Sequence, residues 1–174
     1  IIVHLGKNLA MECSIDLEKI FKDLKHDEDG LYKLRIVYDL EGNFRAQMLP
    51  YAFPEIETFE LVENNDFSYD FKFADRTEFE NMKKKARAQE IIIVKNGQIT
   101  DTSFSNLLFL KNQTWYTPKS FLLNGVQRQN LLKQGKIKET EITLQNLTEF
   151  SHFQLINSMN EFNQDFVYSI EELK

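Results

Sequence analysis

The chain has 174 residues, of which 42% are hydrophobic and 13% aromatic, so it can bury a sizeable core in one large domain or two small ones. A formal net charge of −6 argues against a nucleic-acid-binding protein, which would carry a basic patch. The sequence contains no run of about 18 apolar residues, so no membrane span is predicted. The single cysteine, Cys13, excludes an internal disulfide framework and favours a cytoplasmic location.

The N-terminal part of the sequence predicts a helix followed by a hairpin. Apolar side chains at helical spacing indicate a helix over residues 16–24. The runs LYKLRIVYDL and GNFRAQML, on either side of Gly42, predict two antiparallel strands. Pro50 and Pro54 then interrupt a stretch without clear periodicity, which predicts a linker over residues 51–56.

The rest of the sequence alternates between strand and helix patterns. Expected strands lie within IETFELV, EIIIVKNGQIT, NLLFLKNQTWYT, KIKETEIT and HFQLINS, and expected helices within RTEFENMKKKARA and GVQRQNLLKQG. Strands and helices on both sides of the linker predict a two-domain α+β protein with mainly antiparallel pairing. The expected domains are a small N-terminal α/β domain over residues 1–50 and a larger, mainly antiparallel β domain with helices over residues 57–174.

Several common sites are excluded by the motifs. The three histidines, His4, His26 and His152, are scattered and no cysteine lies at ligand spacing from them, so no metal site is expected. The sequence contains neither of the common glycine-rich phosphate loops and no GxSxG nucleophile elbow.

Three features are candidates for chemistry, and each also has a purely structural interpretation. Lys72 lies between Phe71 and Phe73, and strand alternation would place it on the opposite face from both rings. A lysine in apolar surroundings has a lowered pKa and a nucleophilic amine, although most such lysines extend to solvent.

Asp101 ends a predicted hairpin, where it is either a turn residue or a carboxylate that faces a ligand. The segment LLNGVQRQNLL contains a helix start, whose free N–H groups form an anion site or merely begin a helix.

Taken together and in order, the stretches KFADR, ITDTSFSNLLF, WYTP, LLNGVQR and LINSMN resemble the fold-type IV pyridoxal-phosphate enzymes, the class IV aminotransferases. The resemblance implies the two-domain fold of that family, with its first hairpin missing here. It also implies that Lys72 bears the cofactor as a Schiff base and moves the substrate proton, and that Asp101 keeps the cofactor ring nitrogen protonated. The family usually has Glu at the position of Asp101.

The resemblance assigns the cofactor phosphate to backbone N–H groups at the helix start. Val126 and Gln127 would hold it there, and Ser158 and Met159 would add a second set of donors. Lys7 stands where the family has a phosphate-binding arginine, and it can supply charge without the bidentate geometry of Arg.

Within this family, the compact chain and LINSMN favour aminodeoxychorismate lyase, which forms p-aminobenzoate and pyruvate in folate precursor synthesis. The alternatives are a class IV aminotransferase, which exchanges an amino group between an amino acid and a 2-oxo acid, and an inactive relative that acts as a binding protein. The resemblance also implies a small-molecule amine substrate and a homodimer. Arg45 and Arg76 are candidates for binding the substrate carboxylate, and Arg76 is alternatively structural.

Overall fold

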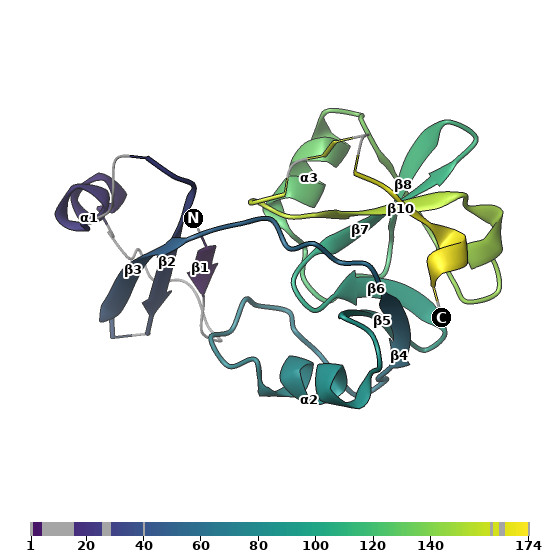
Figure 1. Ribbon diagram of the computed structural model, residues 1–174, viewed down its shortest axis with the longest axis horizontal. Coiled ribbons are helices and arrows are strands. Elements are labelled where there is room, and N and C mark those ends of the chain that lie inside the picture. The colour runs from purple at the N-terminus through teal and green to yellow at the C-terminus, as the bar shows by residue number, and fades with distance from the viewer. Residues whose placement is uncertain are drawn as a thin grey trace. The chain divides into compact units, whose positions relative to one another are not determined.

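The computed structural model describes residues 2–4, 16–25, 29–39, 41–160, 162–163 and 166–173. The chain divides into two compact units, which Figure 1 traces from purple to yellow. The first unit comprises Ile1–Pro54 and Phe71–Asp75, and the second comprises Glu55–Asp70 and Arg76–Lys174.

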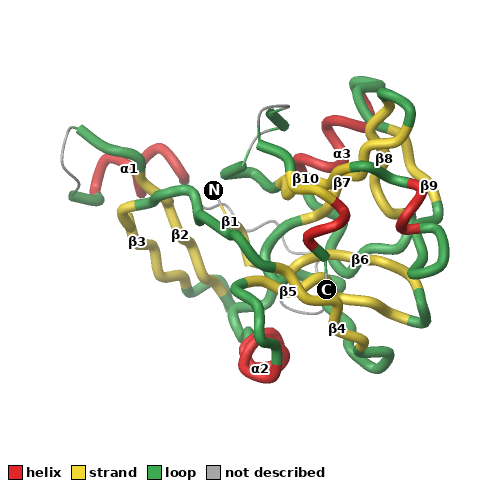
Figure 2. The backbone as a smooth tube through the Cα atoms, turned by 45° about the vertical axis from the view of Figure 1, so that its right-hand side comes forward, coloured by secondary structure: helices red, strands yellow, loops and turns green. Residues whose placement is uncertain are grey.

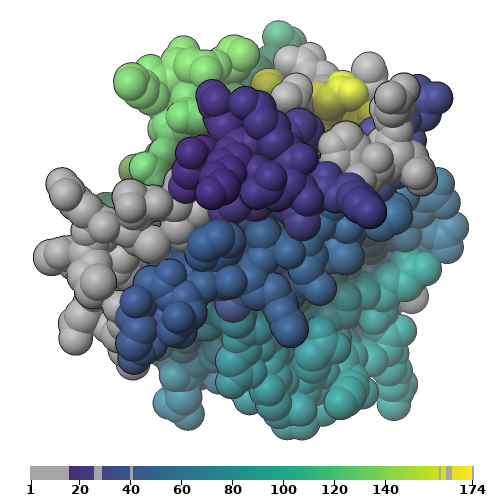
Figure 3. Space-filling model, turned by 90° about the vertical axis from the view of Figure 1, so that its left-hand side faces the viewer, coloured from purple at the N-terminus to yellow at the C-terminus, as the bar shows by residue number. Residues whose placement is uncertain are grey.

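The first unit contains a three-stranded sheet and one helix. Its elements are β1 (Ile2–His4), α1 (Leu17–Asp23), β2 (Tyr32–Tyr38) and β3 (Phe44–Pro50). The strand order is β1-β2-β3, with β1 parallel and β3 antiparallel to β2. The helix begins after Asp16, whose side chain accepts a hydrogen bond from the backbone N–H of Lys19. Helix α1 lies beside β2 and β3 (Figures 1 and 3), and Ile20 of α1 and Ile36 of β2 are buried.

The second unit contains two sheets. A three-stranded sheet has the order β4-β5-β6, and a five-stranded sheet has the order β11-β10-β7-β8-β9. The strands are β4 (Phe59–Glu63), β5 (Glu90–Lys95), β6 (Gln98–Thr102), β7 (Asn106–Lys111), β8 (Thr114–Pro118), β9 (Lys138–Thr140), β10 (His152–Ile156) and β11 (Tyr168–Ser169). The helices are α2 (Thr77–Lys85), α3 (Val126–Lys133) and the short 3₁₀ helices η1 (Leu147–Glu149) and η2 (Ile170–Glu172).

Helix α2 connects β4 to the parallel strand β5, and α3 lies beside β7 and β8 in Figures 1 and 2. Two tight hairpin turns set the register of the strand pairs β5–β6 and β7–β8. Asn96 and Gly97 join β5 to β6 with positive φ angles of 51° and 74°, which a two-residue turn of this type requires. Asn112 and Gln113 join β7 to β8 in the same way.

The core of the second unit lies between its two sheets. Phe59, Ile92, Ile99, Phe109 and Phe153 are among its fully buried side chains. Strands β5 and β7 are buried on both faces, because α2 and α3 cover the sides that face away from this core. This explains why IIIV in β5 and LLFL in β7 are continuous apolar runs instead of alternating patterns.

The predicted α+β fold with mainly antiparallel pairing is confirmed. The prediction that Lys72 lies in a strand, on the face opposite Phe71 and Phe73, is wrong, since residues 64–76 contain neither a helix nor a strand. Asn64, Asp66 and Asp70 are polar loop residues there, and they interrupt the apolar alternation that a strand needs. No helix in the described part of the chain is long and apolar enough to cross a membrane.

Candidate functional site

Asp101 is the centre of the candidate site. It lies near the end of β6, and only 5% of its surface is exposed. Its Oδ1 accepts a hydrogen bond from Asn106 Nδ2 at 2.8 Å, and its Oδ2 accepts from the backbone N–H groups of Leu122 and Leu123, both at 2.9 Å. Asp101 is therefore no local turn residue, because its partners are 5 to 22 residues away in the sequence.

The ionisation of Asp101 reflects two opposing effects. The pKa of Asp101 is raised from 3.8 to about 6, chiefly because burial deprives the charged form of water. The hydrogen bonds from Leu123, Asn106 and Leu122, and the positive charge of Arg128, lower the pKa and offset part of that rise. A further positively polarised donor at this carboxylate would lower its pKa again and favour the charged form.

Asn106 connects Asp101 to the segment that precedes α3. Its Nδ2 also donates to the backbone carbonyl of Leu123 at 2.8 Å. Gly125 approaches the same side chain closely, because a Cβ atom at Gly125 would lie 2.1 Å from Asn106 Oδ1. Only glycine therefore fits at this position without moving Asn106. The sequence motif contained both residues, but their contact could not be read from their spacing.

The N-terminus of α3 lies directly after Gly125. Gly125 caps the helix in an extended conformation, without a side-chain hydrogen bond to the first turn. Within the part of the chain that the structure describes, the backbone N–H groups of Val126 and Gln127 have no acceptor. Val126 is 63% exposed. The free N–H groups that the sequence predicts at this helix start are therefore present, and anion binding to them stays a prediction.

Arg128 fixes the loop between β8 and α3, a role that the sequence did not reveal. Its guanidinium group is buried and donates to Asn124 Oδ1 at 3.0 Å and to the Pro118 carbonyl at 3.1 Å. It also forms an ion pair with Glu139 and lies 4.4 Å from the ring centre of Phe121. The backbone donors of Leu122 and Leu123 belong to this fixed loop.

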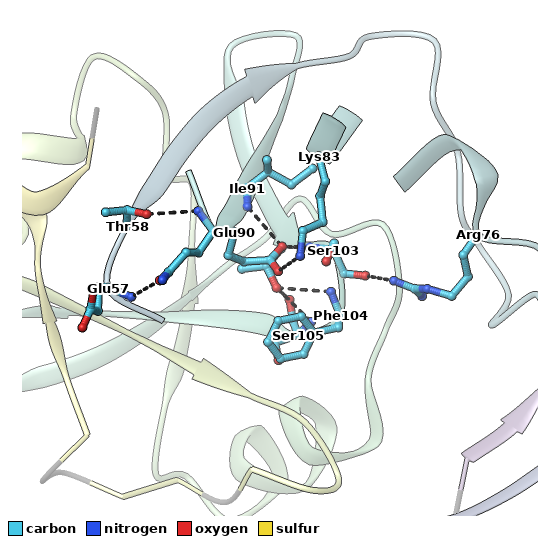
Figure 4. A network of polar contacts seen from close by, with 11 residues as sticks. Glu57, Thr58, Arg76, Lys83, Glu90, Ile91, Ser103, Phe104 and Ser105 are labelled. Atoms are coloured by element: carbon cyan, nitrogen blue, oxygen red, sulfur yellow. Dashed lines mark hydrogen bonds and ion pairs between the residues drawn. The ribbon is translucent and has the colours of Figure 1, made fainter. Parts of the chain in front are cut away.

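A second set of charged side chains fixes the turn between β6 and β7 (Figure 4). The Glu90 carboxylate is buried, accepts from Ser103 N–H at 3.0 Å and pairs with Lys83 of α2 at 2.9 Å. Arg76 donates to the Ser103 carbonyl, and its guanidinium group lies over the Phe79 ring. Both sides of the Ser103 backbone are thus held. This contact supports the structural interpretation of Arg76.

Ser158 and Met159 lie in a turn that Asn157 organises. Asn157 Nδ2 donates to Ser105 Oγ at 2.9 Å, which joins this turn to the β6–β7 turn. Its Oδ1 accepts from Met159 N–H at 2.7 Å and from Asn160 N–H at 2.8 Å. The N–H of Met159 is therefore already used within the turn, whereas Ser158 is exposed.

The structure brings most predicted site residues into the second unit, which contains Asp101, Val126, Gln127, Ser158 and Met159. Lys72 is half-buried in the loop segment Phe71–Asp75, which belongs to the first unit. Arg45 lies on β3 of the first unit and is exposed. Lys7 lies outside the described residues.

Comparisons with known proteins identify the family. A model of the amino-transferase class IV family matches residues 24–163. The crystal structure of a "putative 4-amino-4-deoxychorismate lyase" from Haemophilus somnus 129PT is 38% identical, with a TM-score of 0.75, over 85% of this chain and 78% of that chain.

Two further relatives are similar in sequence. An uncharacterized protein of Haemophilus influenzae is 36% identical over 134 residues, which are 76% of this chain and 71% of that protein. A "putative aminodeoxychorismate lyase" of Schizosaccharomyces pombe is 29% identical over 82 residues, which are 45% of this chain and 36% of that protein. Since the family match spans well over half of the sequence, the chain belongs to the amino-transferase class IV family.

Proposed function

We propose that this protein is a pyridoxal-phosphate-dependent lyase that converts 4-amino-4-deoxychorismate into p-aminobenzoate and pyruvate. The observation that carries the proposal is the buried Asp101 carboxylate, which the Asn106 side chain holds beside the segment that leads into α3. The amino-transferase class IV family is pyridoxal-phosphate-dependent, which supports this cofactor.

The donors and acceptors of the site fit the chemistry of that cofactor. A carboxylate has about four acceptor positions, and Asp101 uses three of them, so one remains for a protonated ring nitrogen. The cofactor phosphate is an anion, and the N–H groups of Val126 and Gln127 are oriented as at other helix starts that bind phosphate. The side chain of Ser158 is exposed and could add a donor, whereas the N–H of Met159 is already engaged.

Each residue then has a defined task. When bound, pyridoxal phosphate supplies an electron-withdrawing ring that stabilises negative charge on the substrate carbon. Asp101 would accept a hydrogen bond from the protonated ring nitrogen and so favour its protonated form. The Lys72 amine would hold the cofactor, and the same amine could accept and return the substrate proton. We also assign Lys7 to the phosphate, as a point charge without bidentate geometry.

The names of two relatives support the lyase over the aminotransferase. The Haemophilus somnus protein, at 38% identity, carries a lyase name, and so does the Schizosaccharomyces pombe protein. An aminotransferase would use the same lysine, carboxylate and helix start, so these residues alone do not separate the two activities. Homodimer formation and the cytoplasmic location stay predictions from the sequence.

The first experiment tests the cofactor. The purified protein is incubated with pyridoxal phosphate, reduced with borohydride and digested, and the modified peptide is mapped by mass spectrometry. We expect a pyridoxyl group on Lys72, no label in Lys72→Ala, and an unchanged label in Lys111→Ala, which removes a surface lysine paired with Glu149. A specific label on another lysine would contradict the role of Lys72. No specific label on the folded full-length protein would contradict the enzyme and leave the binding-protein alternative.

The second experiment separates the two activities. The loaded protein is supplied with 4-amino-4-deoxychorismate, and p-aminobenzoate and pyruvate are measured by chromatography. Formation of both products, lost in Lys72→Ala, is the expected result. Amino-group transfer from an amino acid to a 2-oxo acid, without p-aminobenzoate, would replace the lyase by the aminotransferase.

A further inference from the structure

Asn106 joins two segments that are far apart in the sequence. Its Nδ2 donates both to Asp101 Oδ1 and to the Leu123 carbonyl, each at 2.8 Å. Because the Leu123 carbonyl and the ionised Asp101 carboxylate can only accept, the amide nitrogen must face them, and this fixes the orientation of the side chain. Both amide protons are therefore used, one on the acid and one on the loop before α3.

The other end of the Asn106 amide is also confined. Its Oδ1 lies so near Gly125 that a Cβ there would be only 2.1 Å away. Asn106 begins β7 and pairs with Ile156 of β10 in the five-stranded sheet, so its backbone is held as well. A buried amide fixed in this way can set where a neighbouring carboxylate lies.

Asp101 depends on these donors for its charge. The carboxylate is buried, and losing one hydrogen bond would leave a larger part of its desolvation cost uncompensated. Its other two donors, Leu122 N–H and Leu123 N–H, belong to the same loop whose carbonyl Asn106 binds. Asn106 therefore supports the acid directly and also through the loop that carries those donors.

We propose that Asn106 is a positioning residue that keeps the Asp101 carboxylate charged and fixed relative to the start of α3. The inference rests on the proposed function, in which Asp101 and the α3 start bind the ring nitrogen and the phosphate of one cofactor. Together with the Leu122 and Leu123 N–H groups, the Asn106 amide then sets the spacing between the two groups that recognise opposite ends of the ligand.

The electrostatic surroundings of Asp101 support this role. Among the described residues, Arg128 of α3 is the charged group that acts on this acid, and it lowers the pKa while burial raises it. Arg128 is occupied by Glu139, Asn124 and the Pro118 carbonyl, and it makes no hydrogen bond to Asp101. Asn106 is therefore the side-chain donor that holds the acid.

The test uses the titration of Asp101 in the protein without cofactor, followed by the dissociation constant for pyridoxal phosphate. Asn106→Asp has almost the same shape but replaces the donor by a second acid, and Asn106→Ser is a milder variant that offers one shorter donor. Asn64→Asp is the matched control, because Asn64 Nδ2 also donates to a carboxylate, that of Glu78, at 3.1 Å. Carbon-13 NMR follows the Asp101 carboxyl, whose signal is assigned by its absence in Asp101→Asn.

We expect the upper titration step of the buried acid to rise by about one pH unit or more in Asn106→Asp, since like charges cannot both stay ionised there. Asn106→Ser should shift it in the same direction by less. Pyridoxal phosphate should bind about tenfold more weakly to Asn106→Asp, and Asn64→Asp should match the wild type in both measurements.

Other outcomes would overturn the inference in distinguishable ways. An unmoved Asp101 titration in both Asn106 variants would show that the amide does not support the charge. A shifted titration with wild-type cofactor affinity would show that it does not position the acid for the ligand. A wild-type protein that binds no pyridoxal phosphate would overturn the proposed function itself, and this inference with it.

Discussion

The acid at position 101 is shorter by one methylene than the glutamate usual in this family, and its surroundings show how a shorter side chain is held. Two backbone N–H groups and one side-chain amide converge on the carboxylate, while burial opposes its charge. The balance leaves the pKa at about 6, so near neutral pH the acid is close to its titration point. Folding and ionisation at this residue are therefore coupled.

This coupling predicts a pH dependence of stability in the protein without cofactor. The native pKa of Asp101 lies above the ordinary 3.8, so the native state binds the proton more tightly than the unfolded chain. The resulting stabilisation is fully present below about pH 4 and is lost as the pH rises through about 6. Relative to Asp101→Asn, the wild type should lose up to about 3 kcal/mol between pH 4 and 7.5, a value taken from the size of the pKa change.

Urea unfolding of both proteins at the two pH values measures this difference. Each protein serves as the reference for the other, because all remaining titratable groups are shared. Parallel stability curves would show that Asp101 keeps an ordinary pKa in the native state.

Among the secondary-structure elements, charged side chains of β5 and of the residue before α2 hold the turn between β6 and β7. Glu90 at the start of β5 and Arg76 before α2 bind the N–H and the carbonyl of Ser103. In this turn, which comes directly after β6 and Asp101, charged side chains therefore bind both the N–H and the carbonyl of Ser103. The Lys83–Glu90 pair differs from the surface pair Lys111–Glu149 chiefly in burial of the acid.

Replacing the buried acid should cost more than replacing its surface counterpart. Glu90→Gln leaves Lys83 without its partner and weakens the hydrogen bond to Ser103. We expect a loss of about 2 kcal/mol in the free energy of unfolding, below the usual range for a fully buried pair because Lys83 is 33% exposed. Glu149→Gln should change stability by less than about 1 kcal/mol. Chemical denaturation of the two variants checks this prediction. Equal losses in the free energy of unfolding would mean that burial of Glu90 adds nothing to the stability that the ion pair provides.

The same elements show how far sequence reasoning reaches. The apolar run IIIV, the Asn-Gly turn and the glycine before α3 are local signals, so the hairpin and the helix start were predictable. The partners of Asp101 were not, because Leu122 and Leu123 donate backbone groups whose position depends on a loop fixed by Arg128. The close approach of Gly125 to Asn106 likewise arises from tertiary packing and leaves no spacing pattern.

For the molecule as a whole, the large apolar core belongs to the second unit, where two sheets enclose it. Residues 51–58, which lead from β3 into β4, form neither helix nor strand. Glu55 and Glu57 are exposed in this stretch, whereas Phe59 at the start of β4 is fully buried. The change from exposed to buried chain within a few residues makes a specific prediction for proteolysis.

A glutamate-specific protease at low concentration should cut first after Glu55 or Glu57. The backbone there lies outside the sheets and can enter a protease site, whereas cleavage within β4 would require its pairing with β5 to break. Mass spectrometry should detect a fragment that begins at residue 56 or 58 and resists further digestion. In the double variant Glu55→Gln with Glu57→Gln, that fragment should disappear and total digestion should slow. A first cut after Glu63 or in α2 would instead place the weakest connection of the chain inside the second unit, and the predicted linker over residues 51–56 would be wrong.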